Sequence, residues 1–95
     1  MHASIWRFSG KPDDLLCRYD AMIAEIPRAR MRLHLCLRGT NGIVIVDTCP
    51  TREAFESFAT GDAFRELRAR HGLPEPERLE DFPVHLALVE GAPAG

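Results

Sequence analysis

Four reactive side chains, His34, Cys36, Asp47 and His85, each lie among apolar neighbours in a segment that reads as a β-strand. A histidine imidazole ordinarily titrates near ~6.5, so it both takes and gives a proton near neutral pH. An adjacent carboxylate fixes the tautomer of the ring and raises its basicity. If His34 and Asp47 are cross-strand neighbours, they form an acid–base pair, and His85 on another strand supplies the complementary acid.

The segment around His34 alternates strictly between apolar and polar residues. In Met31–Arg38 (MRLHLCLR) one face carries Met31, Leu33, Leu35 and Leu37, and the other carries Arg32, His34, Cys36 and Arg38. An ordinary solvent face would use Lys, Glu or Thr. Histidine and cysteine there indicate that the second face is enclosed as well.

Patterns elsewhere predict the elements that position these residues. A strand is expected over His2–Phe8, and a helix begins at Lys11-Pro12-Asp13-Asp14 and ends at Pro27. Gly39-Thr40-Asn41-Gly42 predicts a hairpin between Met31–Arg38 and a strand over Ile43–Cys49. The apolar stripe of the first helix consists of Leu15, Leu16, Tyr19, Met22, Ile23 and Ile26.

A second helix is expected after the hairpin. Thr51 caps it, and Thr60-Gly61-Asp62 interrupts it before a further helical piece that Gly72-Leu73-Pro74 stops. Phe55, Phe58 and Ala59 are expected to face inward, and the further piece contains Phe64 and Leu67. A polar connector over Pro74 to Asp81 then leads to a last strand, Phe82–Val89.

The resulting βαββαβ order predicts an α+β, ferredoxin-like domain over residues 1–90, followed by a flexible tail over 91–95. The expected strand order is 4-1-3-2, with two helices on one face of a four-stranded antiparallel sheet. A two- or four-residue hairpin loop puts Leu35, Leu37, Val44 and Val46 on one side. We expect this leucine side to face the helices. The uncovered side then carries Ser4, Trp6, Phe8, His34, Cys36, Ile45, Asp47, Cys49 and His85.

Trp, Phe and Ile are poor choices for a face left in water, so a second copy is expected to cover it and form a homodimer. Two such sheets would enclose a lumen suited to a small apolar or aromatic ligand. The formal charge of -2 gives no reason to expect nucleic acid. No stretch approaches a membrane span or a signal peptide, so a cytoplasmic protein is expected.

Three cysteines at positions 17, 36 and 49 match neither a metal knuckle nor a disulfide framework, and reduced thiols are the default. His34, Cys36 and His85 are potential zinc ligands without diagnostic spacing, and no metal or cofactor is expected. The usual nucleotide, zinc-protease and hydrolase signatures are absent from the sequence.

The chain resembles the dimeric α+β barrel superfamily, which includes antibiotic-biosynthesis monooxygenases, polyketide cyclases and haem-degrading enzymes. The resemblance covers residues 2 to 89 and rests on the βαββαβ order, the passage IVIVDTCPTREAFESF and the interrupted second helix. It implies the barrel fold and a cleft between sheet and helices or within the barrel. Haem degradation fits poorly, because only His71 matches the pattern of that branch. Of the residues typical of the monooxygenase branch, this sequence offers only Trp6 and either Arg7 or Arg38.

Three functions follow as hypotheses. The first is a cofactor-independent enzyme, of cyclase, dehydratase or isomerase type and suited to secondary metabolism, with His34 and His85 as acid and base and Asp47 orienting. The second is a cofactor-free monooxygenase of the same fold, and the third is a non-catalytic ligand-binding or interaction module. Expected substrate-binding residues are Ser4, Trp6, Phe8, Cys36, Ile45 and His71. The structural alternatives stay open: histidines that satisfy hydrogen bonds at a dimer seam, Cys36 as inert lining and Asp47 as a cap of the turn into Pro50.

Overall fold

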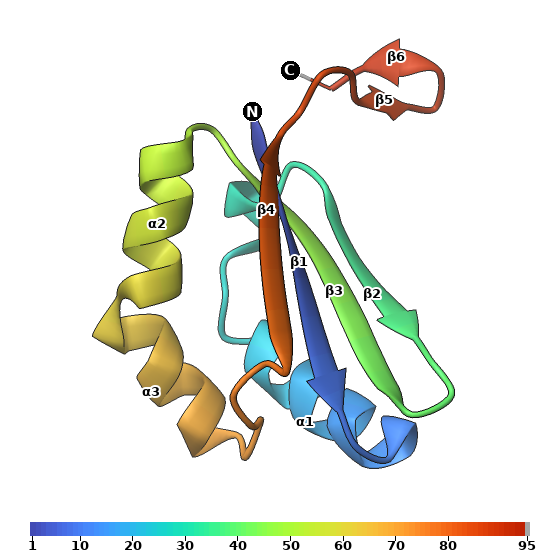
Figure 1. The fold of residues 1–95 in the computed structure, drawn as a ribbon, viewed down its shortest axis with the longest axis vertical. Coiled ribbons are helices and arrows are strands. Elements are labelled where there is room, and N and C mark those ends of the chain that lie inside the picture. Colours follow the sequence, from blue (N-terminus) through green and yellow to red (C-terminus); the bar gives the residue numbers. More distant parts are fainter. Residues whose placement is uncertain (95) are drawn as a thin grey trace.

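Four strands form one antiparallel sheet in the order β2-β3-β1-β4, with the helices packed on one face (Figure 1). The computed structural model describes residues 1–94, apart from the side chain of Arg30. The elements are β1 (His2–Ser9), α1 (Pro12–Ile23), the 3-10 turn η1 (Arg28–Arg30), β2 (His34–Arg38), β3 (Gly42–Cys49), α2 (Arg52–Thr60), α3 (Asp62–Arg70), β4 (Arg78–Pro83), β5 (Leu88–Val89) and β6 (Ala92–Pro93). The sheet order is the expected 4-1-3-2 arrangement, which confirms the ferredoxin-like α+β fold.

The helix boundaries follow local chemistry. Pro12 lies in the first turn of α1 with Asp13 and Asp14 against the positive end of the helix. α1 ends at Ile23, earlier than Pro27, because residues before a proline disfavour helical backbone and Glu25 and Ile26 bond back in tighter turns.

The interruption of the second helix is confirmed. The Thr51 hydroxyl accepts a hydrogen bond from the Ala54 amide at 3.1 Å and caps α2. Gly61 has extended backbone angles, φ −72° and ψ 148°, and separates α2 from α3. Gly72, at φ +74°, ends the second piece in the left-handed conformation that glycine adopts readily.

The hydrophobic core lies between the helices and one face of the sheet. Trp6 and Phe8 of β1 and Ile43 and Ile45 of β3 form its floor. The covering side chains come from α1, α2 and the segment after α3: Leu15, Tyr19, Met22, Phe55 and Leu73. Trp6 and Phe8 are 4% and 3% exposed, so the bulkiest residues of β1 decide which face the helices cover.

This arrangement corrects the predicted orientation of the sheet. The register of β2 against β3 pairs His34 with Asp47, Cys36 with Ile45 and Leu35 with Val46, as the expected hairpin requires. However, His34, Cys36, Ile45 and Asp47 share the side of Trp6 and face the helices. Leu35 and Leu37 are each 46% exposed on the open side. Both sides of the hairpin are apolar, so alternation alone does not show which one is covered.

The predicted last strand, Phe82–Val89, is also wrong. β4 instead spans Arg78–Pro83 and pairs with β1 from Arg7↔Arg78 to His2↔Pro83. Because β1 begins at His2, a strand beyond Pro83 has almost no partner left. The final bond joins the Val84 amide to the Met1 carbonyl oxygen at 3.0 Å.

The chain beyond β4 leaves the sheet. Leu88–Val89 and Ala92–Pro93 pair as a small hairpin, which projects at the top of Figure 1. The predicted tail over 91–95 therefore contains a short strand, while its last residue, Gly95, lies outside the described residues. Across residues 1–94, no helix has the length and apolar character needed to cross a membrane.

Candidate functional site

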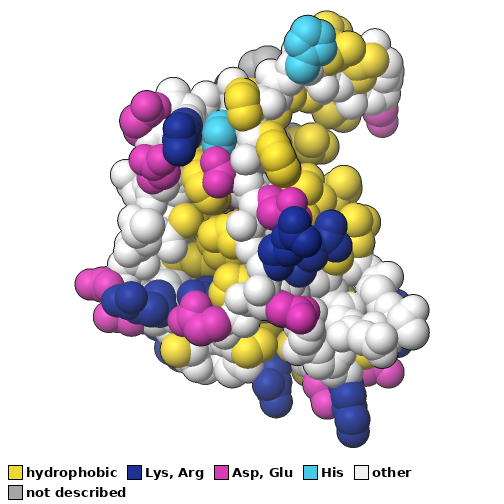
Figure 2. All heavy atoms as spheres, viewed as in Figure 1, with side chains coloured by type: hydrophobic (Ala, Val, Ile, Leu, Met, Phe, Trp, Pro, Cys, Tyr) yellow, Lys and Arg dark blue, Asp and Glu magenta, His cyan; other side chains and the backbone are white. Residues whose placement is uncertain are grey.

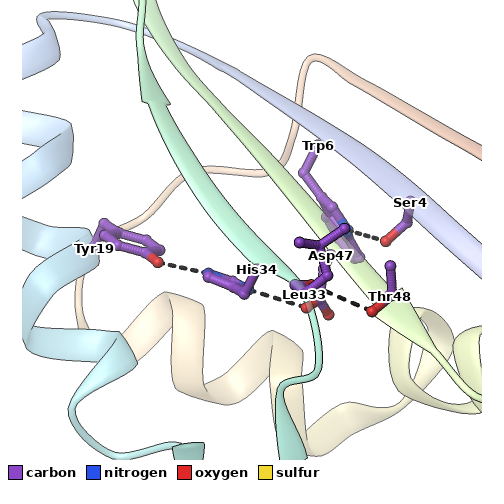
Figure 3. Close-up of polar contacts among 7 residues, drawn as sticks. All are labelled: Ser4, Trp6, Tyr19, Leu33, His34, Asp47 and Thr48. Atoms are coloured by element: carbon purple, nitrogen blue, oxygen red, sulfur yellow. Dashed lines mark hydrogen bonds and ion pairs between the residues drawn. The ribbon is translucent and has the colours of Figure 1, made fainter. Parts of the chain in front are cut away.

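The predicted His34–Asp47 pair forms across two neighbouring strands. β2 and β3 place the two residues directly opposite each other, on the side that faces the helices. His34 Nδ1 donates to Asp47 Oδ1 at 3.0 Å (Figure 3). Because a carboxylate oxygen can only accept a hydrogen bond, Nδ1 carries the proton, and the neutral ring is the Nδ1–H tautomer. The two side chains are 16% and 19% exposed, so water screens the pair only in part.

Tyr19 on α1 completes a chain of three side chains. Its hydroxyl lies 2.6 Å from His34 Nε2, and the two rings are nearly parallel at an interplanar angle of 9° (Figure 3). With Nδ1 protonated, Nε2 holds the lone pair and the tyrosine O–H donates to it. The sequence placed Tyr19 only in an apolar stripe. The available signal was that a buried tyrosine hydroxyl usually requires a hydrogen-bond partner.

A cavity of about 330 Å³ lies beside this chain, between the sheet and the helices. Its size is within the usual range of small-molecule sites. Among the described residues that line it, His34 and Asp47 are the ionisable groups apart from the Cys49 thiol, and none is Lys or Arg. The lining residues are Trp6, Phe8, Met22, Ile23, Ile26, Met31, His34, Ile45, Asp47, Thr48, Cys49, Pro50, Ala54, Phe58 and Phe64.

Aromatic side chains form one wall of the cavity. Trp6 meets Phe58 and Phe64 edge-on, with ring centroids 6.2 Å and 5.3 Å apart. The indole Nε1 donates to the buried Ser4 hydroxyl at 2.9 Å, so this polar atom is satisfied within the protein (Figure 3). Trp6, Phe8 and Ile45 therefore line a cavity on the helix-covered side of the sheet, not on the uncovered side where they were expected, while the Ser4 hydroxyl accepts from the tryptophan. That they bind a substrate stays a prediction.

Two predicted histidines lie elsewhere. His85 follows β4 and is exposed, because that segment has left the sheet, so the expectation that it faces the same cavity is wrong. His71 ends α3 and is ion-paired with Glu25 just after α1. This ion pair links the end of α3 to the segment after α1, and His71 is not among the cavity-lining residues.

The cysteines are free thiols, and two of them are half-buried near the site. Burial raises the pKa of the Cys36 and Cys49 thiols, which favours the unreactive protonated form. Cys36 packs against the core, and Cys49 lines the cavity. Within residues 1–94 no cluster of three or more His, Cys, Asp or Glu is arranged to hold a metal ion.

Burial, with help from nearby Cys36, Asp20 and Asp47, raises the pKa of Tyr19 to about 12 against the opposing effect of Arg28. As Tyr19 is the single tyrosine of the chain, phenolate absorbance reports it alone, and we expect a midpoint near pH 12. The raised pKa favours the neutral phenol in the fold. Its contribution to stability is present below the ordinary value of ~10 and is lost as the pH rises toward about 12.

The matching measurement is the free energy of unfolding in urea at increasing alkaline pH. It should fall more steeply for the native protein than for Tyr19→Phe, which has no phenol to ionise. A phenolate midpoint near ~10 in the folded protein would show that Tyr19 is not held as described.

Comparisons with known proteins support the fold. No protein-family model and no curated protein matches the chain. Among solved structures, it is similar to a putative antibiotic biosynthesis monooxygenase from Chloroflexus aurantiacus J-10-fl, with a TM-score of 0.58 and 12% sequence identity. The match covers 87% of this chain and 92% of that one.

The fold and the site together define the class: a ferredoxin-like α+β protein of the architecture found in that monooxygenase-like structure, with a cavity between sheet and helices. At 12% identity, the similarity concerns the fold and leaves the chemistry to the site itself.

Proposed function

We propose that the protein is a cofactor-independent enzyme that transfers a proton on a small, uncharged, mainly apolar carbonyl compound, as a cyclase, dehydratase or isomerase does. The observation that carries the proposal is the hydrogen-bonded Asp47–His34 pair on the wall of an otherwise apolar cavity. A base in such a site acts without competition from bulk water. The described lining residues include no cation, which favours an uncharged substrate over an anionic one.

The roles of His34 and Asp47 are the reverse of those expected from the sequence: in this proposal Asp47 is the base and His34 orients it. Both ring nitrogens of His34 are engaged, Nδ1 by Asp47 and Nε2 by Tyr19. Among the described contacts Asp47 uses only Oδ1, so Oδ2 is the acceptor available to a substrate. In the proposed step Oδ2 takes a proton from the carbon beside the carbonyl, the C–H electron pair forms the enolate, and the protonated Asp47 returns the proton to the product.

The test needs no physiological substrate. In D₂O, a bicyclic ketone such as 2-tetralone exchanges its α-hydrogens as an enolising base removes and returns them, and ¹H NMR follows the loss of signal. We expect the protein to accelerate exchange well above buffer. Trp6 is the single tryptophan and lines the cavity, so its fluorescence measures ketone binding. Binding without accelerated exchange would contradict the proposed activity and favour a non-catalytic ligand-binding module.

A cofactor-free monooxygenase is the second candidate, favoured by the name of the similar Chloroflexus aurantiacus structure. The same carboxylate would deprotonate an electron-rich phenol, whose anion then reduces O₂. Protein-dependent oxygen consumption with such a phenol distinguishes this chemistry from proton transfer alone.

We also propose the expected homodimer through the open face of the sheet, which carries the leucine side of the hairpin. Leu35, Leu37 and Phe82 are 46–50% exposed there, beside the half-buried Ile5, Val44 and Val46. Arg7, Arg78 and Glu80 form a charged rim, with Glu80 paired to both arginines. Figure 2 shows hydrophobic side chains gathered beside a group of Lys and Arg side chains. An apolar patch with a polar rim is typical of a protein interface.

A cytoplasmic location remains our proposal, supported by three free cysteines, since reducing compartments keep thiols unpaired.

A further inference from the structure

The hydroxyl of Tyr19 contacts the Asp47–His34 pair at the histidine end. It contacts His34 Nε2 at 2.6 Å, and Tyr19 is 7% exposed. Tyr19 does not line the cavity, whereas His34 and Asp47 do. Any influence of this tyrosine on a bound molecule must therefore pass through His34.

We propose that Tyr19 is a positioning residue, which holds the His34 imidazole so that its Nδ1–H stays on Asp47 and leaves Oδ2 directed to the substrate. The proposal rests on the proposed proton-transfer function and extends it to a third residue. A ring fixed at one nitrogen can still rotate about its side-chain bond. A ring fixed at both nitrogens, by groups from different elements, keeps one plane.

The phenol suits this role because it remains a neutral O–H. Burial raises the pKa of Tyr19 to about 12, far above the range in which a histidine titrates. The hydroxyl thus donates to Nε2 while the ring is neutral, and its oxygen accepts if Nε2 gains a proton. The same contact persists in both states.

The groups around this contact come from four elements. Cys36 on β2 and Asp20 on α1 affect the phenol electrostatically, as do Asp47 on β3 and Arg28 in η1. Burial favours the protonated thiol of Cys36, and Asp20 is exposed to solvent. The hydrogen bond to Nε2 is the specific contact of the hydroxyl.

The test is Tyr19→Phe, which deletes the hydroxyl and keeps the packed ring. In ¹⁵N-labelled native protein, we expect a slowly exchanging Nδ1–H proton on His34 and an Nε2 signal typical of a hydrogen-bonded lone pair. In Tyr19→Phe the Nδ1–H proton should exchange too fast to observe. The rate of ketone exchange should fall by roughly tenfold or more, while ketone binding measured by Trp6 fluorescence stays the same.

Two matched proteins complete the design. Uniform 3-fluorotyrosine labelling alters only Tyr19, because it is the single tyrosine, and it should retain the Nδ1–H proton since the hydroxyl remains. Thr60→Val removes another hydrogen-bonded hydroxyl, on α2 far along the chain, and should leave the His34 signals unchanged.

The NMR result decides the proposal independently of turnover. Unchanged His34 signals in folded Tyr19→Phe would overturn it, and so would a lower melting temperature accompanied by unaltered Nδ1–H exchange, which is the signature of a structural hydroxyl. A native protein that shows the expected His34 signals but no ketone exchange overturns the proposed function and leaves the positioning role of Tyr19 supported.

Discussion

Replacing Asp47 by Asn is expected to reduce protein-dependent exchange of 2-tetralone by on the order of 10²-fold or more. The amide has the shape of the carboxylate, and its oxygen can still accept from His34 Nδ1, so the cavity keeps its form. What is lost is the basic oxygen that takes the proton. The affinity for the ketone, measured by Trp6 fluorescence, should therefore change little while the exchange rate falls.

The chain offers a matched control for this substitution. Asp81 accepts from His2 Nε2 at 2.7 Å and lies on the same helix-facing side of the sheet, opposite Ser4. Neither residue lines the cavity. Asp81→Asn removes a carboxylate from a comparable His–Asp pair and should leave the exchange rate unchanged. Equal loss in both variants would show that the effect is one of folding, and full activity of Asp47→Asn would exclude Asp47 as the base.

Replacing Leu35 by Glu is expected to weaken self-association by on the order of 10²-fold or more. Leu35 is 46% exposed on the open face, on the edge strand β2 opposite Val46, and in a twofold dimer each substitution occurs twice in one interface. The two carboxylates would be desolvated near each other, which costs several kcal/mol in total. Sedimentation velocity across a concentration series measures the dissociation constant.

Leu79→Glu is the matched control for this prediction. Leu79 is also an exposed leucine, 38% accessible on β4, but it pairs with Trp6 and so lies on the opposite side of the sheet. It should leave association unaffected. A native protein that sediments as a monomer at all concentrations, or equal dissociation of both variants, would overturn the proposed interface.

The sequence by itself determined the order of the elements and the pairing of the central hairpin. Thr51, Gly61 and Gly72 act through local backbone chemistry, and the helix boundaries they set were predicted closely. The turn between Gly39 and Gly42 and the alternation around it set the register, which puts His34 opposite Asp47, the pairing on which the expected acid–base pair depended. These features depend on neighbours within a few residues or across one turn.

Only the tertiary structure decided which side of the sheet the helices cover, where β4 ends and what binds His34 Nε2. Both sides of the hairpin are apolar, so the choice depended on burying Trp6 and Phe8 of a different strand. β4 stops at Pro83 because β1 begins at His2, a limit set by a partner about 80 residues away. Tyr19 reaches His34 only once α1 packs on that side. Each outcome depends on contacts distant in sequence, which local periodicity does not encode.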